Sequence, residues 1–71
     1  MTEETKNTIR KEVETMSLDE LKLLESAMSS LYWATTNHIV MAVCEEIENI
    51  IDNEVRNRIR QAIDNIALST H

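Results

Sequence analysis

Apolar side chains recur along this chain at spacings of three and four residues, which is the period of an α-helix that buries one side. Two such series predict helices over residues 3–16 and 18–34. Between them, Ser17 and Glu20 have the spacing of a capping box, in which each side chain accepts a hydrogen bond from the other residue's backbone amide. The apolar positions of the two helices are Ile9, Val13 and Met16, followed by Leu21, Leu24, Met28 and Leu31.

The rest of the chain carries one dense apolar series that changes direction half way along. Thr35, Thr36 and Asn37 are weak helix formers and good N-caps, so they predict a short turn and a third helix over residues 37–51. The apolar positions are Ile39, Val40, Val43, Cys44, Ile47, Ile50 and Ile51, and then Val55, Ile59, Ala62, Ile63 and Ile66.

The two halves of this series point about a third of a turn apart at roughly 100° per residue, so one straight helix cannot bury both. We expect a bend or break near Asp52 and Asn53, where Asn53 can cap a fourth helix over residues 54–68. Because the chain contains no glycine and no proline, it can also continue through this point as one bent helix. The pattern alone leaves both arrangements open.

The predicted architecture is an all-α bundle of three to four helices that forms a single domain over residues 1–71. A chain this short buries little apolar surface, and backbone ordering at roughly 1 to 2 kcal/mol per residue offsets most of that gain. Its single cysteine cannot form an internal disulfide. We therefore expect the helices to pack, or intertwine, as a homodimer.

Composition and charge indicate which cellular location and which class of partner to expect. A hydrophobic fraction of 42% with 28% charged residues is typical of a folded chain. The sequence has no apolar run long enough to span a membrane and a polar N-terminus unlike a signal peptide, so we expect a cytoplasmic protein without membrane contact. The net charge of −6 opposes nucleic-acid binding and favours a protein partner with a basic surface.

The sequence contains no motif that indicates catalysis, a cofactor, a metal site or a small-molecule substrate. Cys44 belongs to the apolar series and is interpreted as a buried structural thiol. His38 lacks the companions that a metal site needs, such as C-x-x-C or H-x-x-x-H spacing, and is interpreted as a solvated residue at a helix start. We therefore expect a protein that is not an enzyme.

Five acids, Glu45, Glu46, Glu48, Asp52 and Glu54, follow one another without an intervening basic residue. One interpretation is a solvated helix face. The other is a docking surface for a basic partner, or a mimic of nucleic-acid charge that occupies a DNA- or RNA-binding protein. We assign these five acids to partner binding.

Arg56, Arg58 and Arg60 come directly after the acids, so negative charge is followed by positive charge along the chain. Two copies that cross near Asn53 in antiparallel orientation would place acids opposite arginines. The alternative is pairing within one helix, from Asp52 to Arg56. The residues assigned to self-association are Ile47, Ile51, Val55, Arg56, Ile59 and Arg60.

Trp33 lies on the side of the predicted second helix that carries three serines, away from the leucines. A tryptophan flanked by small side chains fits an anchor at a protein interface, so Trp33 and the adjacent Tyr32 are assigned to partner binding. The alternative is that Trp33 folds over the end of the core beside Tyr32 and shields the turn.

The leading functional hypothesis is a non-enzymatic, self-associating regulator or inhibitor that binds a larger protein through an acidic helical surface. One alternative is a dimeric DNA-binding transcriptional regulator that uses residues 54–68, because that helix carries side chains of the kinds that read base edges. A second alternative is a nucleic-acid-mimicking inhibitor of the phage type, or an antitoxin. The side chains considered for base reading are Asn53, Arg56, Asn57, Arg60 and Gln61.

Overall fold

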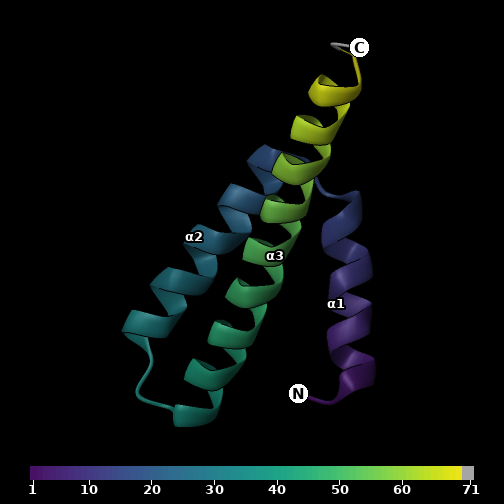
Figure 1. The fold of residues 1–71 in the computed structure, drawn as a ribbon. Coiled ribbons are helices and arrows are strands. Elements are labelled where there is room, and N and C mark those ends of the chain that lie inside the picture. The colour runs from purple at the N-terminus through teal and green to yellow at the C-terminus, as the bar shows by residue number, and fades with distance from the viewer. Residues whose placement is uncertain (70–71) are drawn as a thin grey trace.

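The computed structural model describes residues 1–69 and contains three α-helices, α1 (Glu3–Thr15), α2 (Leu18–Ala34) and α3 (His38–Ser69) (Figure 1). These residues contain no strand, and the predicted all-α class is confirmed. α3 is the longest element, with 32 residues, and it gives the molecule an elongated outline of about 53 × 24 × 15 Å.

The predicted helix boundaries are confirmed at both turns, where side chains cap the helix starts. The Ser17 amide donates to Glu20 Oε1 at 2.8 Å, and the Glu20 amide donates to Ser17 Oγ at 3.2 Å, which completes the capping box of α2. These bonds to Ser17 hold the pKa of Glu20 below its ordinary value. At the second turn, the amide of Ile39 donates to Asn37 Oδ1 at 2.9 Å, so Asn37 caps α3 as expected.

α3 runs without interruption through Asp52 and Asn53, so of the two arrangements left open by the sequence the continuous helix is found, and residues 54–68 form no separate fourth helix. Asn53 is an interior residue of α3 and caps nothing. The physical reason is that Asp and Asn each cost less than about 1 kcal/mol in a helix interior, which is too little to end a helix without further causes. Because α3 does not break, the apolar side chains that point in the second direction, from Ile59 onward, remain exposed to solvent.

α1 and α2 both pack on α3, which runs between them (Figure 1). α2 is antiparallel to α3, and α1 runs in the same direction as α3 (Figure 1). The core lies where the three helices meet, and Ile51 at its centre is 0% exposed. Its buried members are Val13, Leu21, Ile50 and Ile51, and Ile9, Met16, Leu24, Ile47 and Val55 pack against them.

α3 continues past the region that α1 and α2 cover. The helix leads away from the other two at its C-terminal end in Figure 1, and every residue from 59 to 69 is exposed. We call residues 59–69 the distal end of α3.

Cys44, Ile50 and Ile51 of the first half of the apolar series are buried, although Ile39 at the start of α3 is exposed. In the second half, Val55 packs against the core, and the apolar side chains from Ile59 onward are exposed. The angular offset between the two halves is therefore met by exposure of most of the second half.

Candidate protein-interaction surfaces

Two surfaces that carry exposed large apolar side chains stand out on opposite parts of the molecule. The first surrounds Trp33, in the last turn of α2, whose side chain is 81% exposed. The second lies on the distal end of α3, where Ile59, Ile63 and Ile66 are 56%, 59% and 63% exposed. Large apolar side chains that gather at a surface are typical of places where another protein binds.

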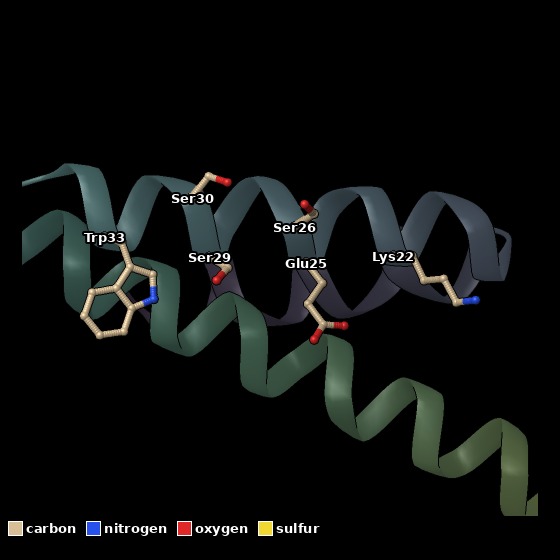
Figure 2. A pocket seen from close by; sticks show the side chains of 6 residues that line it. All are labelled: Lys22, Glu25, Ser26, Ser29, Ser30 and Trp33. Carbon is tan, nitrogen blue, oxygen red and sulfur yellow. The ribbon is translucent and has the colours of Figure 1, made fainter.

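The Trp33 surface is an open hollow of about 570 Å³ on α2. Figure 2 shows the serines lying between Trp33 at one end and Lys22 at the other. Small side chains leave room for a partner to approach the backbone, and tryptophan supplies a large flat contact area. The residues that line the hollow are Lys22, Glu25, Ser26, Ser29, Ser30 and Trp33.

Trp33 does not fold over the end of the core. Its ring meets the neighbouring Tyr32 ring edge to face, with centroids 5.2 Å apart and an interplanar angle of 83°. This contact orients the indole without burying it. The sequence correctly separated Trp33 from the leucine positions, because its place on α2 follows from helical periodicity alone.

Tyr32 links the Trp33 surface to α3 through an acid. Hydrogen bonding to the Glu45 carboxylate, together with the negative charges of Glu45 and Glu48, raises the pKa of the Tyr32 hydroxyl above its ordinary value. Both acids belong to α3, so this interaction joins the end of α2 to the start of α3. Tyr32 therefore also has a structural role beside the contact role predicted for it.

The five predicted docking acids do not form one surface. Glu45, Glu48 and Asp52 fall within about 60° of one another around α3, on the side of α2. Glu46 lies on the side of α1, where its carboxylate is 3.3 Å from the Met1 amino group and 3.9 Å from Lys6 Nζ. Glu54 is bound to Arg58 at 2.9 Å, and its side chain is only 15% exposed. Glu46 and Glu54 are thus engaged within the chain.

Arg58 binds the C-terminal end of α1, a structural role that the sequence pattern did not indicate. Its Nη2 donates to the carbonyl oxygens of Val13 at 3.0 Å and Met16 at 2.6 Å, with a longer bond of 3.4 Å to Glu14. These carbonyls end α1, which has no basic residue in its last turn. Arg58 supplies the missing positive charge at the helix C-terminus from more than 40 positions away.

Ion pairing within α3 also differs from the predicted pair. Among residues 1–69, the i,i+4 pair in this stretch joins Glu54 to Arg58 and not Asp52 to Arg56. Arg58 points to the C-terminal end of α1, where its bonds to carbonyl oxygens hold the guanidinium in place, whereas Arg56 is exposed. Glu54, four residues before Arg58, therefore pairs with a guanidinium whose position is already fixed.

Half of the residues predicted to mediate self-association are part of the core. Ile51 is fully buried, and Ile47 and Val55 pack against the core cluster, so none of the three offers a free contact surface. Arg56, Ile59 and Arg60 are exposed. A contact between copies centred on Asn53 therefore lacks its apolar centre.

The distal end of α3 provides an apolar surface in their place. Ile59, Ile63 and Ile66 fall within about 60° of one another around the helix, and we call them the distal stripe. Ile63 and Ile66 were not among the predicted self-association residues. The signal was present as the offset between the two halves of the apolar series, which was interpreted as a break.

The five side chains considered for base reading all lie on the exposed side of α3. Asn53 and Asn57 border a groove beside α1 that also contains Arg10 and Glu14. Glu46 and Asp64 project from α3 within about 60° of these residues, and their carboxylates oppose a phosphate backbone. The other three side chains are Arg56, Arg60 and Gln61.

The residues considered for chemistry are dispersed. Cys44 is a free thiol and is 1% exposed, as its place in the apolar series predicted. His38 is exposed at the first residue of α3. Within residues 1–69, no three side chains of the His, Cys, Asp and Glu types gather closely enough to hold a metal ion.

None of the helices in residues 1–69 combines the length and the apolar character that crossing a bilayer requires. No protein-family model matches the chain, and searches of curated proteins and of solved structures likewise found no match.

Proposed function

We propose that this chain is a non-enzymatic protein-interaction module that self-associates as a homodimer and regulates or inhibits a second protein. The distal stripe serves self-association, and the Trp33 surface with the neighbouring acids serves the second protein. The observation that carries the proposal is the distal end of α3, because three isoleucines there are more than half exposed on a helix without intramolecular cover in residues 1–69.

The free energy that burial of the distal stripe can contribute supports a modest affinity between copies. Burying one isoleucine side chain fully contributes roughly 1.5 to 3 kcal/mol. Association costs on the order of 4 to 15 kcal/mol in lost freedom. A pair of copies contributes both distal stripes, and their partly exposed side chains give a gain of similar size to that cost. The gain exceeds the cost only at the lower end of that range, so we expect a weak dimer that dissociates on dilution.

The second protein is expected to carry a basic surface that binds beside Trp33. Glu45 is exposed on α3 and interacts with Tyr32, the ring neighbour of Trp33, and the negative charge of Glu48 also acts on Tyr32. Acids beside an exposed tryptophan favour a partner that combines positive charge with a slot for an aromatic ring. Asp64 and Glu46 argue against a nucleic acid as the partner of α3.

Sedimentation at micromolar concentration tests self-association. The wild-type chain is expected to sediment as a species larger than its 8.2 kDa monomer. Ile63→Lys should weaken association by more than about tenfold, because the substitution occurs twice in a symmetric pair and each 1.4 kcal/mol is a factor of about ten.

Leu23→Lys is the matched control for this experiment. Leu23 is 71% exposed on α2, so the substitution adds the same charge at an exposed apolar position outside the distal stripe. It should leave association unchanged, and both variants should retain their helical circular dichroism. A wild-type chain that stays monomeric throughout the micromolar range would refute self-association.

A further inference from the structure

α1 buries little apolar surface against the rest of the molecule. Val13 is its one buried residue, and Ile9 and Met16 pack against the core only from the edge. α2 and α3 form an antiparallel pair whose core includes Leu21 and Ile51, which are 1% and 0% exposed. A helix of 13 residues with one buried valine is held less firmly by apolar contacts than this pair is.

The contact between α1 and α3 is incompletely filled. Two hollows of about 190 and 130 Å³ lie along it, and every residue that lines them belongs to α1 or α3. Arg10, Ile50 and Asn53 line both hollows. Well-packed interiors contain few voids larger than a water molecule, because each void removes dispersion contacts. α1 therefore gains less from packing on α3 than a closely fitted helix would.

Polar contacts attach α1 to α3 at its two ends. Lys6 Nζ lies 3.9 Å from Glu46 Oε1, and Arg58 Nη2 donates to the carbonyl oxygens of Val13 and Met16. Glu46 and Arg58 are separated by about 18 Å along α3, which is close to the length of α1. All hydrogen bonds and ion pairs between residues 1–16 and residues 38–66 involve one of these two side chains of α3.

The contact at Glu46 leaves one of its oxygen atoms unsatisfied. Glu46 Oε2 is buried and accepts no hydrogen bond from residues 1–69, although the Met1 amino group lies 3.3 Å from it. A buried polar atom without a hydrogen bond destabilises the arrangement that buries it. Movement of α1 away from α3 would return this oxygen to water, which lowers the free energy needed for that movement.

The start of α2 does not depend on α1. The capping box between Ser17 and Glu20 is made within α2 and its N-cap, so it persists when α1 moves. Met16 and Ser17, both with extended backbone angles, join the two helices. A change in the backbone angles of Met16 can therefore release α1 without disturbing α2, as at other hinges between elements.

We propose that α1 is a strap that opens as a unit about Met16 while the pair of α2 and α3 stays folded. The open form exposes Val13 and the side of α3 around Ile50, so the equilibrium between the closed and open forms controls how much apolar surface the protein presents. The contacts at Glu46 and Arg58 hold the closed form. This inference does not depend on the self-association proposed above.

Amide hydrogen exchange of the full-length wild-type chain tests the strap. Relative to their intrinsic rates, amides throughout α1 should exchange faster than those around Leu21 and Ile51 by about 100-fold or more, and by a similar factor along the helix. Equal protection of all three helices would show one cooperative unit and overturn the proposal. Fast exchange confined to the ends of α1 would indicate fraying and would also overturn opening as a unit.

Glu46→Lys tests the contact at the start of α1 without changing the sequence of α1. The substitution places a second positive charge beside Lys6, so exchange in α1 should accelerate by about fivefold or more, with the core of α2 and α3 unchanged.

Asp52→Lys is the matched control for this substitution. It makes the same charge reversal at an exposed position of α3 and should alter exchange in α1 by less than about threefold. Equal effects of the two substitutions would overturn the role of Glu46. Loss of protection in all three helices of Glu46→Lys together would overturn the strap, because α1 would then not open independently.

Discussion

Tyr32 is the only tyrosine of the chain, and its hydroxyl group reports on one contact between α2 and α3. The hydrogen bond to the Glu45 carboxylate raises the pKa of Tyr32, because ionised tyrosine would face a negative charge. A folded-state pKa above the unfolded value means that the contact stabilises the fold below the ordinary tyrosine pKa. This contribution is lost as the pH rises through the raised value.

Glu45→Gln is therefore expected to lower the pKa of Tyr32 toward its ordinary value. The substitution keeps a hydrogen-bond acceptor and removes the negative charge. Ultraviolet absorbance of the phenolate during an alkaline titration measures this pKa for Tyr32 alone. Asp52→Asn is the matched control, because it removes an exposed acid of the same side of α3 and should leave the titration nearly unchanged. Identical titrations for wild type and Glu45→Gln would contradict the contact.

At the scale of helices, α1 depends on a side chain from α3. α1 has 13 residues and one fully buried side chain, Val13, so its own apolar burial is small. Arg58 binds the carbonyl oxygens at its C-terminal end and is itself fixed by Glu54. A bidentate guanidinium can serve several acceptors at once, which a lysine ammonium does less well.

Arg58→Ala is expected to lower the free energy of unfolding by about 2 kcal/mol, the value of one or two hydrogen bonds to a charged group. Denaturant-induced unfolding measures the loss, and amide hydrogen exchange should accelerate first in α1. Arg56→Ala removes an exposed arginine one half-turn away and should change stability by less than about 0.5 kcal/mol. Equal effects of the two substitutions would show that the carbonyl contacts contribute nothing.

Local signals explain which helices were predictable from the sequence. Ser17 with Glu20, and Asn37, are short-range caps that act within three or four residues, so both turns were placed correctly. The course of α3 through Asp52 and Asn53 depends on the small difference between continuing a helix and bending it, which tertiary packing decides. Arg58 binds backbone atoms more than 40 residues away, and helical periodicity does not predict such a contact.

The candidate surfaces also contain features that the sequence predicted and features that it did not. Exposure of Trp33 follows from its angular position on α2, which the sequence gives directly. The separation of Glu46 and Glu54 from the other acids follows from where α1 packs on α3, which the sequence pattern does not contain. The distal stripe was visible as an angular offset, but its meaning depended on whether α3 breaks.

For the whole molecule, we expect the uneven distribution of charge to influence the proposed association of copies. Arg56→Glu combined with Arg60→Glu changes the net charge from −6 to −10 and removes the positive charges beside the distal stripe. We expect weaker association at low ionic strength and partial recovery when added salt screens the repulsion. Sedimentation across a salt series measures both effects.

Lys11→Glu combined with Lys22→Glu is the matched control for charge, because it gives the same net charge of −10 at exposed positions away from the distal stripe. The control should associate more tightly than the arginine variant at every salt concentration. Equal affinities would mean that total charge alone governs association.

Trp33 and the distal end of α3 lie toward opposite ends of the molecule, since α2 ends beside the start of α3 (Figure 1). Two copies joined through their distal ends in antiparallel orientation would therefore present their tryptophans at the two outer poles. Such a pair is bivalent, but the distance between its two Trp33 surfaces prevents both from binding a single small target. It would instead bridge two target molecules, or two repeats of an extended one, with an avidity set by the spacing between those repeats.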